Sequence, residues 1–242
     1  MTKKLKIIGD FNFEERRIVS SFVEGKGAEY IYKEVLKTIK TGVWYDPRTE
    51  RMDGGSTLLA ARVDSIVRPL GIRVTNLADL IRPEIRRMTE GEYHFVTPDI
   101  IFRSMKDNFE PNRILIEKLV PLVEEKLGVL KLPCLISGFD VKPSKDKRGY
   151  GVEIVPRSDF SVLYDGRLVG RNYTEVFSCV DRNKLPMLSH SKFGIVSWQS
   201  AKDGLSSLSL GRSGNIHSYG SGLMTSSENG RIVLVKDVVE KR

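Results

Sequence analysis

The stretch 134-CLISGFDVKPSKDKRGYGVEIVP-156 shows the pattern that dominates the second half of the chain. Two short apolar runs, 134–141 and 152–155, flank a polar loop at 142–151. Short apolar runs bounded by Gly, Pro, Asp or Asn are typical of β-strands. The stretch therefore predicts two extended segments joined by a basic loop.

Similar short apolar segments follow one another up to residue 235, so residues 129–242 predict an antiparallel β-rich region. Asp165-Gly166 is the strongest hairpin signal, because two-residue turns with positive φ favour this pair. Asn229-Gly230 is a second signal of the same kind, and residues 212–215 predict a third, looser turn. We expect neighbouring strands to pair across each of these turns.

The first half of the chain has helical patterns instead. Apolar residues recur at helical spacing in three segments, 28–42, 57–71 and 112–128. Ser56 is placed to cap the second segment, and Pro121 predicts a kink or two half-helices in the third. Start signals predict three further helical segments: 13–25, 77–88 after the capping residue Asn76 and with a break at Pro83, and 98–108 after the strong signal Thr97-Pro98-Asp99.

These two patterns together predict an α+β fold. A helical N-terminal region, 1–128, would pack with an antiparallel β-rich C-terminal region, 129–242. A chain of 242 residues fits either one α+β domain or two smaller domains that meet at 128–131.

Composition predicts a folded, soluble protein, since 40% of the residues are hydrophobic and 29% are charged. No apolar run approaches the roughly 20 residues of a membrane-spanning helix. The apolar run at 5–8 is too short for a secretory signal, so we expect a cytoplasmic protein without a membrane partner. Cys134 and Cys179 are too few for a disulfide framework and are expected to be small buried residues, although a bridge between them stays open.

The positive charge is concentrated in the second half of the chain. The formal net charge is +8, and residues 131–242 carry 17 Lys and Arg against 11 Asp and Glu. Residues 1–130 are nearly balanced, with 22 against 20. A local excess of this kind favours a polyanionic partner such as DNA or RNA, or an acidic surface, while solubility alone is the other explanation.

The basic loop is the first candidate site. Cations in a flexible connection can follow a phosphate backbone, and an aromatic ring among them can stack on a base. The candidate nucleic-acid-binding residues are Lys142, Lys145, Lys147, Arg148, Tyr150 and Arg157. The alternative is a solvated hairpin loop, and the loop lacks the motif of any established nucleic-acid reader.

A metal-dependent nuclease is the second candidate chemistry. Such enzymes place acids on neighbouring strands so that Mg²⁺ activates water, and Asp140 and Glu153 have that arrangement with Lys142 nearby. The lysine expected two residues after Glu153 is missing, because Val155 stands there. Mg²⁺ would be the cofactor only under this reading, and otherwise no cofactor is expected.

No complete catalytic motif is present in the sequence, which favours a non-enzymatic role over an enzymatic one. Ser189 and Lys192 match S-x-x-K, but the helix that should follow the serine is missing from the pattern. The three histidines share no metal-site spacing with one another or with a cysteine. The sequence therefore favours a nucleic-acid-associated protein without sequence specificity. A non-catalytic protein-interaction or structural component acting through β edges is the alternative, and a Mg²⁺-dependent nuclease is the third reading.

Overall fold

The computed structural model describes residues 18–88, 94–146, 148–169, 175–181, 185–188, 196–200, 203–211, 215–218, 222–226 and 229–237. Helices and largely antiparallel sheets make up this part of the chain, which confirms the α+β fold class. Within the described ranges, no helix is long and apolar enough to cross a membrane.

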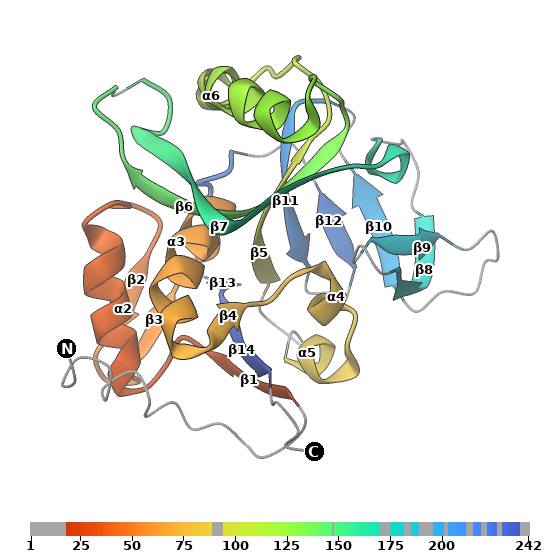
Figure 1. Cartoon of the computed structure of the whole chain (residues 1–242). Helices are drawn as coiled ribbons and strands as arrows, with labels where there is room; N and C mark the ends of the chain where they lie inside the picture. Colours follow the sequence, from red (N-terminus) through yellow and green to blue (C-terminus); the bar gives the residue numbers. More distant parts are fainter. Residues whose placement is uncertain are drawn as a thin grey trace.

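A large sheet forms the centre of the molecule (Figure 1). Within the described residues its strand order is β7-β6-β5-β11-β12-β10-β8-β9, and β13 pairs with β5. The pairs are antiparallel except for β10 with β12 and β13 with β5. The strands are β5 (His94–Phe102), β6 (Cys134–Pro143), β7 (Val152–Tyr164), β8 (Glu175–Val180), β9 (Pro186–Leu188), β10 (Val196–Ser200), β11 (Leu205–Leu210), β12 (Ile216–Ser218) and β13 (Gly230–Arg231).

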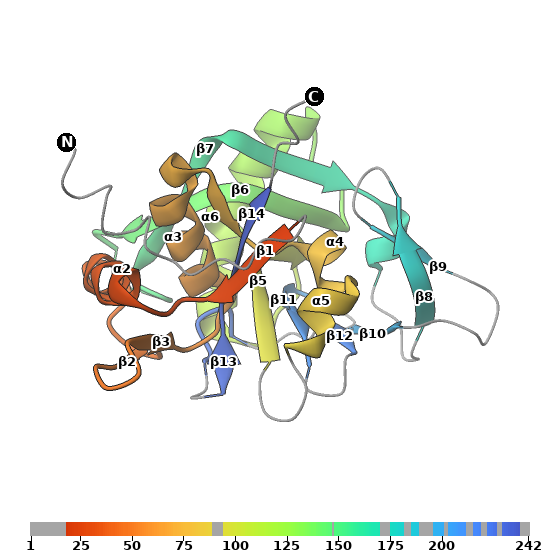
Figure 2. The same ribbon diagram turned by 90° about the horizontal axis from the view of Figure 1, so that it is seen from below.

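Two smaller sheets complete the described strands. One has the order β1-β14-β4, and the other is the β2–β3 hairpin. Their bounds are β1 (Ile18–Phe22), β14 (Val233–Asp237), β4 (Ile72–Val74), β2 (Trp44–Asp46) and β3 (Arg51–Asp53). Because β1 and β14 are antiparallel neighbours, segments from the two ends of the chain lie side by side (Figure 2).

The predicted helical and β-rich regions share their sheets. β5 comes from the first half of the chain, yet it lies between β6 and β11 from the second half. β4 and β1 likewise pair with β14. This interleaving favours one α+β unit over two separate ones.

The three main helices are present at the predicted places, as α2 (Lys26–Leu36), α3 (Thr57–Val67) and α6 (Glu110–Leu127). The predicted end of the first one is wrong, because α2 ends at Leu36 and not at Gly42. The Ser56 side chain caps α3 by accepting a hydrogen bond from Leu59 N at 3.3 Å. α6 is one continuous helix that contains Pro121. Shorter helical turns are η1 (Arg68–Leu70), α4 (Leu77–Leu80), α5 (Pro83–Arg87) and η2 (Gly166–Leu168).

The hairpin formed by β6 and β7 lies between two helices. α6 covers one face of this hairpin and α3 lies on the other (Figure 1). Ile100 and Phe102 of β5, Ile136 of β6 and Leu119 of α6 are fully buried in one hydrophobic cluster. Cys134 is buried in the same cluster as expected, whereas the side chain of Cys179 lies outside the described residues.

The helix predicted at 98–108 is wrong, because residues 94–102 form β5. Every residue of β5 after His94 is buried, so this segment packs against neighbours on both faces of the sheet. A helix with one apolar stripe would bury only one side. Pro98 lacks a backbone N–H, and it lies before the β6 ladder begins at Ile100. On the β11 side of β5, the pairing register shifts between Ser207 and Ser209, so the hydrogen-bonded ladder is irregular near Pro98.

The helix predicted at 13–25 is also wrong over its described part. Ile18–Phe22 form β1, which pairs with β14, so a tertiary partner overrides the local pattern. Residues 13–17, and the short apolar run at 5–8, lie outside the described residues.

The two strongest hairpin signals mark other structures. Among the described residues, β7 and β8, the strands on either side of Asp165-Gly166, are not neighbours in the sheet. The Asp165 side chain instead accepts a hydrogen bond from Arg167 N at 2.9 Å, where η2 begins. β8 pairs with β9 and β10. Gly230 begins β13, which is a parallel partner of β5. The strand pairing predicted across the third, looser turn is confirmed, because β11 and β12 are antiparallel and Gly211 N donates to Asn215 O at 2.8 Å. Its middle residues, 212–214, lie outside the described part.

Candidate functional site

The predicted basic loop connects β6 and β7 as a true hairpin. The two strands are antiparallel, and Ser144 N donates to Gly151 O at 2.9 Å where the ladder ends. The register shifts between Ser137 and Phe139. Gly138 occupies the shift with a φ of +74°, and a side chain there would collide with the Asp159 carbonyl.

Tyr150 anchors this loop to the body of the protein. Its hydroxyl donates to Asn112 Oδ1 of α6 at 2.6 Å and accepts from Leu223 N at 2.7 Å. Its ring contacts Phe109 with centroids 6.2 Å apart, and burial raises its pKa well above the ordinary value. The structure thus gives Tyr150 an anchoring role that the sequence did not indicate.

Three predicted cations lie together on this anchored hairpin. Lys142 and Lys145 are exposed, and the Arg148 side chain is 71% exposed. Arg148 also donates from Nη2 to Asp146 at 2.9 Å, and this hydrogen bond is the main cause that lowers the pKa of Asp146 to about 2. Lys147 lies outside the described residues.

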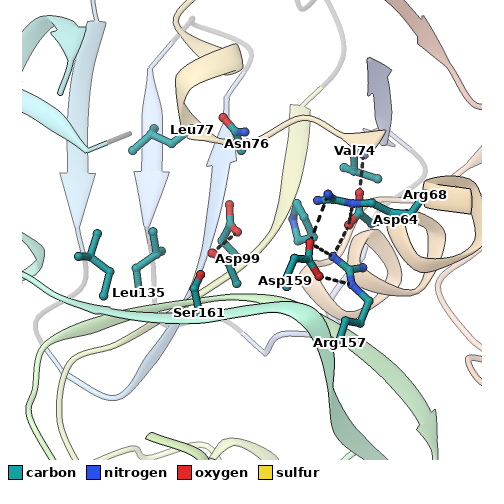
Figure 3. A pocket seen from close by; sticks show the side chains of 14 residues that line it. Asp64, Arg68, Val74, Asn76, Leu77, Asp99, Leu135, Arg157, Asp159 and Ser161 are labelled. Atoms are coloured by element: carbon teal, nitrogen blue, oxygen red, sulfur yellow. Dashed lines mark hydrogen bonds and ion pairs between the residues drawn. The ribbon is translucent and has the colours of Figure 1, made fainter. Parts of the chain in front are cut away.

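Arg157 belongs to a different part of the molecule. It lies farther along β7, and its side chain is only 16% exposed. Its Nη2 is 2.8 Å from Asp64 Oδ2, its Nε donates to Asp159 at 2.9 Å, and its Nη1 donates to Ser65 at 2.9 Å. The guanidinium is therefore committed to neighbours on α3 and β7 (Figure 3).

Arg157 lines a cavity of about 420 Å³ (Figure 3). Polar residues of α3 and β7 form one side of it, around Asp64. This carboxylate is fully buried and accepts from Val74 N at 2.7 Å and from Arg68 Nε at 2.9 Å. Asp64 thus ties α3 to β4, and through Arg157 it also ties α3 to β7.

The other side of the cavity holds a second buried acid, Asp99 of β5, which is 6% exposed. Ser137 Oγ donates to Asp99 Oδ1 at 2.7 Å. Leu77 and Leu135 line the same cavity on one side of Asp99 (Figure 3). Among the described lining residues, those with charged side chains are Asp64, Asp99, Asp159, Arg68 and Arg157. This set has an excess of one negative charge, which suits a neutral or cationic ligand better than a phosphate.

Asp64 and Asp99 escaped the sequence-based search. Each interrupts an apolar segment, Asp64 in 57–67 and Asp99 in 95–102. An acid inside an apolar run was the available signal, because a buried carboxylate needs partners and those partners mark a site. The partners themselves come from distant segments, which is why local patterns did not reveal them.

The two candidate nuclease acids have different surroundings. Asp140 forms a two-point ion pair with Arg62 of α3, with Nη1 at 3.0 and 3.2 Å from its oxygens. Glu153 is exposed and lies directly opposite Lys142, on the same face of the hairpin as Asp140. Across the described ranges, no group of three or more His, Cys, Asp or Glu is arranged to hold a metal ion.

Comparison of the chain with protein-family models, with curated proteins and with solved structures found no match. We therefore infer function from the contacts, burial and charge of the residues described above. The features that carry such an inference are the anchored basic hairpin and the cavity beside Arg157.

Proposed function

We propose that the protein binds nucleic acid without sequence specificity, through phosphate contacts made by the β6–β7 hairpin. The observation that carries this proposal is the exposure of Lys142, Lys145 and Arg148 on a loop that Tyr150 holds in place. Cations that neutralise phosphates release counterions, which drives association. An anchored loop also loses less conformational entropy on binding than a mobile one.

The charge distribution supports the same proposal. The excess of Lys and Arg lies after residue 130, the part of the chain that supplies this hairpin. Lysine acts as a flexible point charge, so it contacts phosphate whatever the base. Binding of this kind is expected to depend strongly on salt and weakly on sequence.

The test is fluorescence anisotropy with labelled single-stranded DNA, single-stranded RNA and duplex DNA, each titrated at about 50 and about 200 mM salt. The variant Lys142→Gln/Lys145→Gln/Arg148→Gln removes three cations from the hairpin. We expect weaker binding and a salt-dependence slope that is smaller by about 2 for a single strand, since each phosphate contact contributes about 0.7.

A matched control separates the hairpin from net charge. Lys26, Lys33 and Lys40 are exposed on and beside α2, and their replacement by Gln changes the charge by the same amount. The proposal requires that this control keep most of the affinity. Absence of binding at low salt, or an equal loss in both triple variants, would overturn it.

A second candidate function, small-molecule binding, is favoured by the buried Asp99 carboxylate in the cavity of about 420 Å³. Cavities of this size hold small ligands, and the acid among leucines suits an apolar body with paired N–H donors. Benzamidine is a simple probe of that chemistry. We expect saturable binding by calorimetry that Asp99→Asn abolishes, and absence of binding to the native protein would end this candidate.

A protein partner that pairs with a sheet edge has less support. Within the described residues, β7 is the last strand on its side of the large sheet. It carries Pro156 and the charged residues Glu153, Arg157 and Asp159. Proline and charged residues on an edge strand hinder pairing with another chain, so β7 is poorly suited to bind a partner strand.

A further inference from the structure

A second cavity, of about 230 Å³, lies at the beginning of α3. Most of the described residues around it carry a hydroxyl group, and none of these described residues is an acid, a lysine or an arginine. The lining residues are Gly55, Ser56, Thr57, His94, Val96, Ser207, Ser209, Gly222, Thr225 and Ser226. They come from the start of α3, from β5 and β11, and from the 222–226 segment.

The electrostatics of this cavity favour an anion. α3 has 11 residues, and its N-terminus carries the positive end of the helix dipole. Its first turn contains no acid to offset that charge. Leu58 N and Leu59 N already donate to Leu223 O and to the Ser56 side chain, so the helix dipole and the nearby hydroxyl groups carry the attraction for phosphate or sulfate.

Thr57, the first residue of α3, supplies an independent indication of a ligand. It lines the cavity and is fully buried. Its Oγ1 has no hydrogen-bond partner among the residues that the structure describes. Buried polar groups in native proteins almost always have a partner, so an unpaired buried hydroxyl at a cavity points to an acceptor that binds there.

The walls of the cavity are held in place by hydrogen bonds. Gly55 N donates to Ser226 Oγ at 2.7 Å, and Leu58 N donates to Leu223 O at 3.2 Å. A serine oxygen that accepts one bond keeps its own O–H to donate. Leu223 also donates to Tyr150, so the 222–226 segment connects this cavity to the anchor of the basic loop.

Glycine at position 55 keeps the backbone close to its neighbours. A Cβ at Gly55 would be 3.0 Å from Arg231 N and 3.0 Å from Gly230 Cα. Any side chain there would push β13 away from the start of α3. The close approach therefore fixes the donor groups of Ser56 and Thr57 relative to the sheet.

We propose that this cavity binds one phosphate group, held by the α3 N-terminus and the hydroxyls of Thr57, Thr225 and Ser226. A cation is disfavoured because the helix start is positive and the lining residues that the structure describes include no carboxylate. The volume lies below the range of about 300–1,000 Å³ for whole drug-sized ligands, so it suits a phosphate group whose remaining part extends outside. The site does not depend on nucleic-acid binding by the β6–β7 hairpin.

The experiment follows backbone amide shifts of residues 55–60 by NMR while inorganic phosphate is added, with sodium chloride matching the ionic strength. We expect saturable shifts at the start of α3. Thr57→Val is close in size and removes only the hydroxyl donor, so the fold should be retained. We expect Thr57→Val to weaken phosphate affinity about tenfold, because the variant loses a hydrogen bond to a charged group.

Thr75→Val is the matched control. Thr75 is also fully buried with an unpartnered Oγ1, but it does not line this cavity. The proposal requires that Thr75→Val leave phosphate affinity unchanged. Absence of saturable shifts in the native protein, or the same loss in both threonine variants, would overturn the phosphate site.

Two further probes identify the source of the phosphate. A 5′-phosphorylated oligonucleotide that competes with inorganic phosphate, when its 5′-hydroxyl counterpart does not, indicates a terminal phosphate. Equal competition by both indicates a backbone phosphodiester. The phosphate titration is repeated on the triple variant Lys142→Gln/Lys145→Gln/Arg148→Gln. Amide shifts at the start of α3 that persist in this variant would show that the phosphate site is independent of the hairpin.

Discussion

At the residue scale, Asp64 is the acid of the large cavity that has partners on three different segments. It is fully buried and accepts from Val74 N and Arg68 Nε, while Arg157 Nη2 lies 2.8 Å from its Oδ2. A buried charge is tolerated only when charged and hydrogen-bonding partners surround it. Three donors from three segments meet that requirement, so this side chain acts as a structural link between α3, β4 and β7.

We expect Asp64→Asn to destabilise the protein by about 3 kcal/mol, because the change leaves two arginines without their buried counter-charge. Urea unfolding followed by circular dichroism measures the loss. Asp159→Asn is the control, since Asp159 is 40% exposed and its ion pairs are screened by water. That control should cost no more than about 1 kcal/mol. Equal losses in the two variants would contradict the structural role of Asp64.

The Arg148–Asp146 pair makes a prediction about pH. The hydrogen bond from Arg148 lowers the pKa of Asp146 to about 2 in the folded protein, and an unfolded chain has an Asp pKa of about 3.9. A lowered carboxyl pKa contributes stability above the unfolded value, and this contribution is lost as the pH falls from about 4 to about 2. Arg148→Gln should raise the pKa of Asp146 toward the ordinary value, as measured by NMR titration of its carboxyl carbon. Lys145→Gln should leave it nearly unchanged, and an unaltered pKa in Arg148→Gln would refute the pairing in solution.

At the element scale, the β6–β7 hairpin is held at its tip by one aromatic side chain. Tyr150 bonds to α6 and to the 222–226 segment, so the loop is tied to two elements that are distant in sequence. The same segment forms part of the cavity at the start of α3. Disturbance of Tyr150 is therefore expected to affect both the hairpin and that cavity.

We expect Tyr150→Phe to destabilise this contact by about 1–2 kcal/mol, because Leu223 N and Asn112 Oδ1 lose their partner. Hydrogen exchange at the Leu223 amide should then be roughly tenfold faster. Tyr164→Phe is the control, since Tyr164 is 50% exposed. Unchanged exchange at Leu223 in Tyr150→Phe would mean that the hydroxyl does not hold the loop.

Local signals predicted some elements well and others badly, and the difference has a physical cause. α2 and α6 each have an apolar stripe along one face, and such stripes are visible in the sequence. α3 is buried on most sides, but its capping residue Ser56 marks its start. β5 has a helix start signal at Thr97-Pro98-Asp99, yet burial on both faces makes it a strand. A segment that is buried on both faces takes its structure from its neighbours.

At the scale of the whole molecule, β5 is the strand that joins the two halves of the chain. It lies between β6 and β11, and both of these come after residue 128. Without it, buried apolar faces and ladder groups of β6 and β11 would be exposed to water. The two halves are therefore expected to fold together.

We expect fragments 1–128 and 129–242 to be largely unfolded when each is produced alone. The measurement is the dispersion of amide signals in NMR spectra of each fragment, compared with the intact chain. Co-expression of the two fragments should restore a dispersed spectrum, because the sheet can then form. A well-dispersed spectrum from either fragment alone would show two independent domains.

The sequence by itself determined what depends on neighbours along the chain. Ser56 and Asn76 cap their helices through residues two or three positions away, and the hairpin around residues 142–151 follows from apolar runs on either side of a polar loop. The sequence also located the excess positive charge, which is a property of composition.

Only the tertiary structure decided where the chemistry lies. Arg157 was predicted beside the basic loop, and the structure pairs it with Asp64, which is distant in sequence. The cavity at the start of α3 combines residues 55–57 with others from 94 to 226. Such groupings are fixed by strand order and register, and these depend on long-range packing that no local pattern of residues records.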